Sequence, residues 1–583
     1  MAAQRMRTEG NDFFSRGDYL QAVEKYSAYI ECVADEDGPS KNSDLLFGYS
    51  NRAQGYLKLE RYAKALEDAE KALRLDSSHL KSWLRKTKAL EGLKFHQEVL
   101  NFSRQVLRNY KKRMHGSHAK EFQLSLEAAE RKDRQTRLGR FEDGIDTFWD
   151  LSTGIPVPPS MEEYVGPVEI KRVDGMGRGV FATRDLAPGE LLFVSNSLVT
   201  IRIPVESMDS HEESNAKSAK KLLQALKRCV RHAELDKLED LSQLQFLVQI
   251  DALGGPYPTE PMIRDCPPMR YFSPVNGLPP QERKILDQDY KHPTLRTNFD
   301  DEMLRKIVER RQFSHWATNN DELNGIYALP SLMNHSCIPN VAVTTMQNAT
   351  VTKMYRAGKK IKKGEELFYA YFNIYCPLDA RRAYYPSLGC RCERCENEET
   401  VLLEVQHLKS LSVQCNKFWQ DRPKYVHLSQ RERSKKRNQC LICLNLLESL
   451  LECNSTFASL TEIEKDWIRA SFVRFNRLLL DPALALAVAS CTREDLVHDI
   501  KLVSVAVKAM NTVQPGSDMA LAMISGLCNR VGRTRFSQEV ELSLSDLHTL
   551  GIEIIRTLNG SCLKEETVRK LFSYSSLMLT GSF

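Results

Sequence analysis

Three stretches of the chain differ in the spacing of their hydrophobic and polar residues. From residue 5 to about 112 the spacing is helical, and it repeats: the pattern Tyr-x2-Ala that begins at Tyr19 returns at Tyr62, and a weaker copy begins at Phe95. The second and third copies lie about 33 residues apart, and a polar insert at 34–43 displaces the first. A period of this length indicates helix pairs that stack into a solenoid with a concave groove.

Short apolar runs with strand character follow between residues 166 and 203. The runs VEIKRV, GVFATR and ELLFVSNSLVTI are separated by a glycine-rich turn at 175–179 and by Pro188-Gly189. Residues 204–312 read as an insertion, helical in pattern at 216–254 and from 298, and beyond residue 396 the spacing is again helical. The pattern predicts a multidomain α+β fold: an all-α N-terminal solenoid, a β-rich middle with a helical insert, and an all-α C-terminal region.

The changes of spacing also predict where the domains begin and end. The prolines of GIPVPPS at 154–160 preclude regular structure and mark a linker. We expect a repeat domain at 1–135, a linker at 136–164, a β-rich domain in two parts at 165–203 and 313–380, the insertion at 204–312, a cysteine-rich loop at 381–400, and a helical domain at 401–583.

Composition narrows the class of protein without identifying it. Of the 583 residues 42% are hydrophobic and 27% are charged, as in ordinary globular proteins, and the net charge of +6 is too small to argue for nucleic-acid binding. The N-terminus lacks the apolar core of a secretory signal, so the fifteen cysteines predict reduced thiols. No run of eighteen apolar residues occurs. We expect a soluble protein of the cytoplasm or nucleus, with no membrane segment.

Closely spaced cysteines give the clearest chemical signal. Cys390, Cys392 and Cys395 form a Cys-x-Cys-x2-Cys triplet in a polar loop. Structural zinc is held by four tetrahedral ligands, so the triplet needs a fourth from elsewhere. Cys337, held in a turn by Pro339, is the natural supplier. The alternative, free cysteines in a loop, leaves the spacing of the triplet unexplained.

Four motifs in this order resemble the SET domain of protein lysine methyltransferases, specifically the branch of the SET-and-MYND proteins. They are GMGRGVF at 175–181, NHSCIPN at 334–340, GEELFYAY at 364–371 and CRCERC at 390–395. The SET-like parts cover about 165–203 and 306–396, and the MYND finger is absent. The resemblance implies methyl transfer from S-adenosylmethionine to a lysine of a histone or non-histone protein. It also implies a zinc ion shared by the NHSC cysteine and the post-SET triplet.

The resemblance assigns roles to individual residues. Tyr371 matches the catalytic tyrosine, and Tyr369 is its reserve, because residues two apart in a strand face the same side. Asn334 and His335 match the positions that hold the polar end and the adenine of the cofactor; a buried structural Asn-His pair is the alternative. In the family the glycine-rich turn also passes along the cofactor, so the resemblance implies that Met176, Gly177 and Arg178 contact the cofactor.

Two positions depart from the family pattern. Many relatives have an aromatic residue two positions before the cysteine triplet that stacks on the adenine, and this chain has Leu388 there. Many also have Asn-x-Phe ahead of the NHSC motif, and the nearest counterpart here is Arg311-Gln312-Phe313. Both departures leave a second hypothesis open, in which the SET fold has lost activity and the chain acts as an adaptor.

The N-terminal repeats resemble tetratricopeptide repeats, and their inner helices resemble the carboxylate clamp that binds the acidic C-termini of Hsp90 and Hsp70 chaperones. Cations and amide donors in such a groove can hold a main-chain carboxylate together with a side-chain carboxylate. The family has lysine where this chain has arginine at the first position, and the two differ in hydrogen-bond geometry. A solvated basic helix face is the alternative. The matching residues are Arg7, Asn11, Asn51, Lys81 and Arg85.

Three further features have simpler interpretations. The basic run at 353–363 could contact nucleic acid, but a solvated turn before the GEEL strand explains it better. The basic run at 431–437 could be a nuclear-import signal or a patch for an acidic partner, but a solvated loop is the favoured interpretation. Cys440, Cys443 and Cys453 are expected to be buried thiols on a helix rather than a second metal site.

Overall fold

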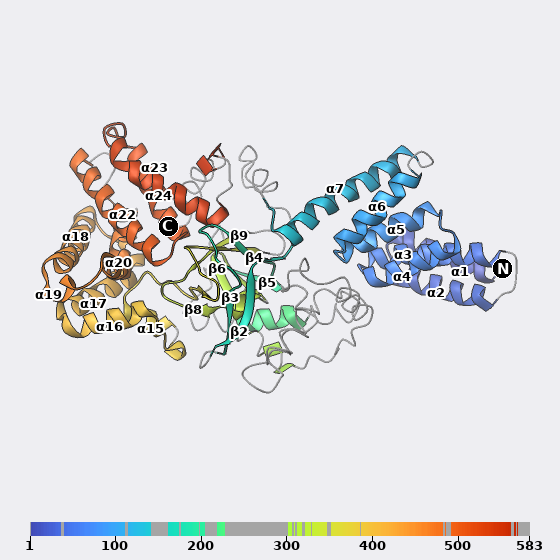
Figure 1. Ribbon diagram of the computed structural model, residues 1–583, viewed down its shortest axis with the longest axis horizontal. Coiled ribbons are helices and arrows are strands. Elements are labelled where there is room, and N and C mark those ends of the chain that lie inside the picture. The colour runs from blue at the N-terminus through green and yellow to red at the C-terminus, as the bar shows by residue number, and fades with distance from the viewer. Residues whose placement is uncertain are drawn as a thin grey trace.

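A computed structural model describes most of the chain outside the insertion. The described residues are 2–35, 40–110, 115–141, 161–173, 177–197, 199–204, 218–227, 312–316, 321–327, 329–346, 351–384, 386–481, 484–485, 491–560 and parts of 301–308 and 565–569. The predicted linker motif at 154–160, Met176, Arg311 and most of the insertion lie outside these residues. Figure 1 shows helices at both ends and the β-strands between them, which confirms the predicted multidomain α+β class.

Seven helices form the described part of the N-terminal solenoid (Figure 1, blue). The small residues of the predicted repeat lie at helix contacts: Ala22, Ala65 and Ala69 are fully buried. Gly10 is required for close packing, because a Cβ there would lie 2.7 Å from the ring of Tyr26. The helices are α1 (Ala2–Arg16), α2 (Tyr19–Asp35), α3 (Lys41–Lys58), α4 (Tyr62–Leu75), α5 (Leu80–Gly92), α6 (His96–Tyr110) and α7 (Gly116–Leu138).

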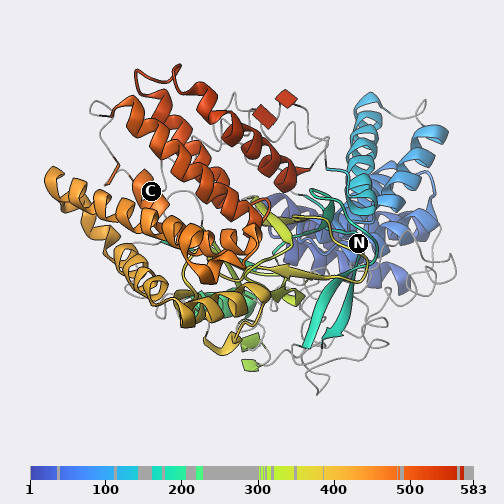
Figure 2. The same ribbon diagram turned by 60° about the vertical axis from the view of Figure 1, so that its left-hand side comes forward.

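The long helix α7 leads from the solenoid to the β-rich region (Figures 1 and 2). It ends at Gly139, whose positive φ of 60° favours glycine. Phe141, just beyond, is buried in the same hydrophobic core as helices near the C-terminus. Glu162, which precedes the first strand, is buried against the solenoid: its carboxylate lies 3.4 Å from His96 and 3.2 Å from Lys132. A buried ion-pair cluster therefore joins the solenoid to the β-rich region.

Eleven described strands form three small sheets with the orders β1-β4-β10-β9, β2-β3-β11-β8 and β5-β7-β6. The strand runs predicted at 166–203 are present as β2 to β5. The expected solvated turn at 353–363 is wrong for its first half, because residues 353–357 lie in β10 and Lys353 is buried. The strands are β1 (Tyr164–Val165), β2 (Val168–Val173), β3 (Gly177–Ala182), β4 (Leu191–Ser195), β5 (Val199–Pro204), β6 (Gln312–Trp316), β7 (Asp321–Ile326), β8 (Asn334–His335), β9 (Val341–Met346), β10 (Thr352–Ala357) and β11 (Glu366–Tyr369).

A short described piece of the insertion packs on these sheets. Residues 218–227 are helical, and Leu222 and Leu226 are fully buried in one core with Leu304 and Val308. Apolar residues of β2, β3, β4, β10 and β11 complete this core. The two ends of the insertion are thus held on the same side of the β-rich region.

The C-terminal region is helical and covers the β-rich region on the side away from the solenoid (Figure 2, yellow to red). Capping boxes at Ser429, Thr461 and Thr492 fix the starts of three helices. The elements are α15 (Leu378–Tyr384), η6 (Pro386–Leu388), α16 (Glu393–Glu404), α17 (Gln406–Asp421), η7 (Arg422–His427), α18 (Gln430–Cys453), α19 (Ser455–Ala458), α20 (Glu462–Ser471), α21 (Val473–Leu480), α22 (Arg493–Val513), α23 (Asp518–Gly532) and α24 (Glu541–Asn559).

Two sequence predictions for α18 need correction. The basic run at 431–437 is helical rather than a loop, and Arg437 is buried with its guanidinium 2.5 Å from Asp499. Cys440 and Cys443 are buried as expected, but Cys453 at the end of the helix is exposed. No helix among the described residues is long and apolar enough to cross a membrane.

The Glu162 cluster should make a pH-dependent contribution to stability. Despite burial, which opposes it, the nearby imidazole of His96 and the charges of Lys94 and Lys132 lower the pKa of Glu162 to about 2. We expect Glu162→Gln to lower the free energy of unfolding by about 3 kcal/mol at neutral pH. The difference in the free energy of unfolding between Glu162→Gln and wild type should reach its full size above about pH 4.5. It should shrink as the pH falls towards 2, because the wild-type carboxylate then binds a proton in the folded state as well.

Urea unfolding across this pH range measures the effect. Glu130→Gln is the control, since Glu130 pairs with Arg104 at the surface, where both side chains are about half exposed, and it should change stability by less than about 1 kcal/mol. Equal stability of Glu162→Gln and wild type at neutral pH would contradict the assigned role of the cluster.

Candidate functional site

The NHSC and GEEL motifs lie side by side, although about thirty residues separate them in the sequence. Strand β8 pairs in parallel with β11, with Phe368 opposite Asn334 and Tyr369 opposite His335. Asn340 strengthens the junction: its side-chain amide donates to the carbonyl oxygen of Glu366 (2.7 Å), and its side-chain oxygen accepts from the backbone N–H of Phe368 (2.7 Å). The motifs are therefore fixed relative to each other by both backbone and side-chain hydrogen bonds.

Glu366 brings the glycine-rich motif to the same place. Its carboxylate accepts a hydrogen bond from the side-chain amide of Asn334 at 2.6 Å, and burial raises its pKa. A Cβ on Gly179 of β3 would lie 2.2 Å from this carboxylate, so any larger residue there would displace the carboxylate. Three motifs thus meet at one half-buried carboxylate. The sequence analysis did not single out Glu366 for this contact, although its motif was recognised.

His335 uses both of its ring nitrogens in this region. Nδ1 accepts a hydrogen bond from the backbone N–H of Tyr371 at 3.1 Å, so Nδ1 carries no proton. In the neutral ring the proton is then on Nε2, which lies 3.3 Å from Sγ of Cys337 and donates to it. The ring also stacks on Phe372, with 4.6 Å between ring centroids. One buried imidazole therefore connects the backbone of the predicted catalytic tyrosine to a predicted metal ligand.

Tyr371 itself is 41% exposed, and its hydroxyl donates to the carbonyl oxygen of Met333 at 2.6 Å. Its ring centroid lies 6.5 Å from that of Tyr369. Tyr369 packs edge-on against buried Tyr355, at 6.2 Å, and burial, with a smaller effect of the charge of Asp518, raises its pKa to about 12. The accessible hydroxyl beside the NHSC motif is therefore that of Tyr371.

The sequence analysis missed the residues behind these tyrosines. Lys353 and Tyr355 alternate along β10, and the ammonium of Lys353 lies 5.1 Å from the ring centroid of Tyr327. Burial lowers the pKa of Lys353 to about 8. A run of lysines usually indicates solvated surface, and the alternation Lys-x-Tyr at 353–355 was the available sign of a strand with a buried face.

The remaining predicted cofactor residues are only partly described. Gly177 and Arg178 lie in β3, where their backbones pair with Val173 and Arg172 of β2, while Met176 and the side chain of Arg178 lie outside the description. Leu388 ends the short helix η6 and is half-buried.

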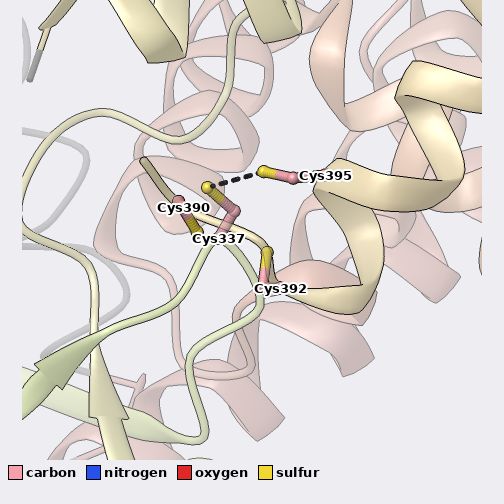
Figure 3. Close-up of side chains that lie close together, drawn as sticks. All are labelled: Cys337, Cys390, Cys392 and Cys395. Atoms are coloured by element: carbon pink, nitrogen blue, oxygen red, sulfur yellow. Dashed lines mark hydrogen bonds between the residues drawn. The ribbon is translucent and has the colours of Figure 1, made fainter. Parts of the chain in front are cut away.

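The four predicted cysteines converge, as Figure 3 shows. The sulfur atoms of Cys337, Cys390, Cys392 and Cys395 all lie within 4.8 Å of one another, and those of Cys337 and Cys395 are 3.6 Å apart. Four thiols at this spacing offer the donor set of a structural tetrahedral zinc site.

A buried polar network fixes the cysteine loop to helix α20. Glu398 accepts hydrogen bonds from Arg381 (3.0 Å), Arg394 (2.9 Å) and Ser471 (2.6 Å), and each of the three charged side chains is at most 4% exposed. Arg394 also donates to the carbonyl oxygen of Cys337 at 3.0 Å. Two arginines and one glutamate leave a buried positive charge next to the cysteines. Four thiolates around Zn²⁺ carry a net charge of −2, so the donor set and its surroundings both fit zinc.

The predicted clamp residues gather around Tyr26 in the solenoid groove. The hydroxyl of Tyr26 donates to the side-chain oxygen of Asn11 at 2.8 Å, and the amide of Asn51 lies 3.5 Å from the same oxygen. Burial raises the pKa of Tyr26, while the positive charges of Arg85 and Arg7 oppose the shift, so both arginines lie near its ring. Arg7 is also directed towards Asp44 of α3, at 4.0 Å.

Arg85 lies in this groove without an acidic partner. It donates to Ser50 and, at 3.2 Å, to Gln54, and burial lowers its pKa to about 10. Among the described residues neither Arg85 nor exposed Lys81 forms an ion pair. Both line a pocket of about 600 Å³ together with apolar side chains and further lysines. The basic residues of the lining, Arg85 and Lys81 included, outnumber the acidic residues Glu91 and Glu121. The other lining residues include Leu57, Lys58, Leu84 and Lys88.

Two family models match the chain. One, described as SET domain, matches residues 177–372, and the other, described as Tetratricopeptide repeat, matches residues 47–79. The chain therefore contains a SET domain and a tetratricopeptide repeat. These matches agree with the predicted combination of domains and do not distinguish the SET-and-MYND branch.

Curated proteins are similar to the chain over short parts of their length. The DnaJ homolog subfamily C member 7 homolog of Schizosaccharomyces pombe is 32% identical over 144 residues, which are 24% of this chain and 29% of that protein. Protein unc-45 homolog B of Xenopus laevis is 38% identical over 89 residues (15% of this chain, 9% of that protein). Mitochondrial import receptor subunit TOM70 of Rattus norvegicus is 34% identical over 98 residues (17% and 15%). The chain thus spans less than a third of the length of these relatives.

Among solved structures, the Arabidopsis OM64 TPR domain is similar to part of the chain. It is 25% identical, and the match covers 22% of this chain and 95% of the OM64 domain with a TM-score of 0.19.

Zinc content tests the cysteine cluster directly. We expect the purified chain to contain one zinc ion per molecule by mass spectrometry of the metal, and Cys390→Ser to lose it, because a closed structural site needs all four ligands. Cys453→Ser, which removes an exposed cysteine on α18, should keep the metal. Equal zinc in wild type and Cys390→Ser would exclude the cluster as the binding site.

Proposed function

We propose that this chain is an S-adenosylmethionine-dependent protein lysine N-methyltransferase whose tetratricopeptide repeats recruit a partner protein. The SET match supports the activity in outline. The observation that carries it is the convergence of three distant motifs on Glu366 and His335, next to the accessible hydroxyl of Tyr371. The cytoplasm and nucleus, where thiols stay reduced and chaperones and histones occur, are the compartments that suit such an enzyme.

The residues around Tyr371 fit the proposed cofactor. Half-buried Asn334 and exposed Tyr371 lie next to buried His335. The carboxylate of Glu366 lies against Gly179 and accepts a hydrogen bond from Asn334, so the backbone at Gly177 to Gly179 is close to Asn334. Asn334, His335 and the β3 backbone would hold the polar end and the adenine of the cofactor. When bound, S-adenosylmethionine supplies a methyl group on a sulfonium centre. Zinc, held by the four cysteines, has a structural role and takes no part in the transfer.

The tyrosines have two tasks in this proposal. A free lysine has a pKa of about 10.4 and must lose its proton before it can attack. Burial of the amine away from water, in a channel lined by tyrosines, disfavours the charged form, and Lys353 is an example of the effect of burial within this chain, since burial lowers its pKa to about 8. The hydroxyl of Tyr371, held by the carbonyl of Met333, would orient the amine, so that catalysis rests on positioning and electrostatics.

The second candidate is a SET-fold adaptor without activity. Leu388 favours it, because a leucine cannot stack on the adenine as an aromatic ring does. The two candidates differ in whether the chain binds S-adenosylmethionine and transfers its methyl group.

The groove suits a partner protein with an acidic C-terminus, such as the Hsp90 and Hsp70 chaperones, whose C-terminal peptide would bind in it. Arg85, Lys81, Asn11 and Asn51 would hold the terminal carboxylate and a neighbouring side-chain carboxylate, and the basic and apolar pocket beside them would take preceding residues of the peptide. A half-buried guanidinium without a carboxylate is better satisfied when such a ligand binds.

Replacing Tyr371 by phenylalanine tests the enzyme. With core histones and a cell lysate as methyl acceptors, we expect wild type to transfer labelled methyl from S-adenosylmethionine and Tyr371→Phe to be slower by about 100-fold or more. Tyr110→Phe in α6, which keeps its ring contact with Trp83, should retain the wild-type rate. Unchanged transfer by Tyr371→Phe would remove Tyr371 from the catalytic role, and wild type that neither binds the cofactor nor transfers methyl would favour the adaptor.

Peptide binding tests the clamp. We expect a peptide ending in Glu-Glu-Val-Asp to bind the full chain, and Arg85→Ala and Lys81→Ala each to weaken binding about tenfold or more, since each removes a charged hydrogen-bond donor. Amidation of the peptide C-terminus should weaken it similarly. Arg104→Ala, outside the pocket and paired with Glu130 at the surface, is the control. Binding that survives both amidation and Arg85→Ala contradicts the clamp.

A further inference from the structure

Three arginines surround one tryptophan in the C-terminal helical region. The guanidinium carbons of Arg422, Arg474 and Arg477 lie 5.3, 5.3 and 4.7 Å from the ring centroid of Trp419. Trp419 belongs to α17, Arg422 to η7, and the other two arginines lie one turn apart on α21. We call these four residues the arginine cluster. Neither the SET domain nor the repeat groove contains them.

The cluster has more positive charge than its neighbours neutralise. Arg422 is paired with Asp481 at 2.6 Å. Among the described residues Arg474 donates to the amide oxygen of Asn416, at 3.0 Å, and Arg477 to the sulfur of Met519, at 3.4 Å, a weak acceptor. Neither of these two arginines forms an ion pair in the part of the chain that the structure describes.

Arg474 shows the strongest imbalance. It is 5% exposed, and its buried Nε has no hydrogen-bond partner, which destabilises a charged group. Arg477 is half-buried, and burial together with the charges of Arg422 and Arg474 lowers its pKa to about 10. Packing on a tryptophan face explains one arginine; it does not explain why three like charges are brought together with donors unused. A bound anion would account for both features.

The cluster lies towards the SET domain. Asn416, which accepts from Arg474, donates to Asp379 directly after the SET strands, at 2.8 Å. Arg477 contacts Met519 at the start of α23, next to Asp518. The charge of Asp518 acts on Arg477, on Tyr369 and on Tyr375, and the hydroxyl of Tyr375 donates to Gln514, just before α23, at 3.3 Å. The start of α23 therefore lies close both to Arg477 and to the tyrosines.

We propose that Arg474, Arg477 and Trp419 form a subsite for an acidic side chain of the protein substrate, a few residues from the lysine that is methylated. This inference rests on the proposed methyltransferase function and adds to it a class of substrate. The fork of a guanidinium matches the two oxygens of a carboxylate, and the half-buried setting strengthens their attraction. Asp518 lies close to Arg477 and to the tyrosines, so a segment with lysine at one end and aspartate or glutamate at the other matches these groups in charge.

Binding of designed peptides to the full chain tests the subsite without requiring methyl transfer. Each fluorescent peptide contains one lysine in a glycine–serine background, and one glutamate is moved through successive positions on either side of it. We expect one position of the glutamate to give the tightest binding by fluorescence anisotropy, about tenfold tighter than the peptide with glutamine there. A phosphoserine peptide at the same position distinguishes the two anion types.

Two variants assign the preference to the cluster. Arg477→Met and, separately, Arg474→Met should abolish the preference for glutamate over glutamine while leaving the binding of the glutamine peptide unchanged. Arg382→Met, which removes an exposed arginine paired with Glu399, should keep it. Thermal melting confirms that each variant is folded. If Arg474→Met does not fold, Arg477→Met, at the less buried position, provides the test alone.

The outcomes separate this inference from the proposed function. A glutamate preference that disappears in Arg477→Met supports the subsite even if no methyl transfer is found. No position-dependent glutamate preference, or a preference that survives Arg477→Met, overturns it even if the chain is an active methyltransferase. Phosphoserine binding more than tenfold tighter than glutamate at the same position would overturn the assignment to a carboxylate.

Discussion

The two hydrogen bonds of the His335 ring hold together the parts on which the candidate active site depends. One nitrogen accepts from the backbone of Tyr371, and the other donates to Cys337. Because the first bond fixes the tautomer, the second can form only if Cys337 accepts, as a thiolate does. The position of the tyrosine is therefore linked to the state of the cysteine cluster, and through Arg394 and Glu398 to helix α20 of the C-terminal region.

Buried charge without an internal partner recurs at the three places where a ligand is proposed. Arg381 and Arg394 exceed Glu398 by one positive charge beside the cysteines. Arg85 in the groove and Arg474 and Arg477 on α21 also lack carboxylate partners among the described residues. A folded chain loses stability by burying charges that are not neutralised, so each imbalance is best understood as half of an interaction that a metal–thiolate centre, a peptide terminus or a substrate side chain completes.

Short-range patterns predicted much of the fold and of the candidate site. The repeat period gave the solenoid, and the cysteine spacing together with Cys337 gave the cluster that the structure brings together. What the sequence could not give are contacts between distant segments: the meeting of Gly179 and Asn334 at Glu366, the burial of Lys353, and the three arginines around Trp419. Basic runs at 353–363 and 431–437 suggested solvated surface, yet tertiary packing buries Lys353 and Arg437. Charge patterns indicate exposure only on average, because a buried ion pair or an aromatic face can hold a single cation.

The most direct test of the link through His335 is a calorimetric titration of S-adenosylmethionine into the zinc-loaded chain and into the same chain after zinc removal by a chelator. We expect one-to-one binding that disappears with the metal and returns when zinc is restored, because loss of the Cys337 contact releases His335 and the segment around Tyr371. Equal binding with and without zinc would contradict this link, and absence of binding in the zinc-loaded chain would contradict the methyltransferase itself.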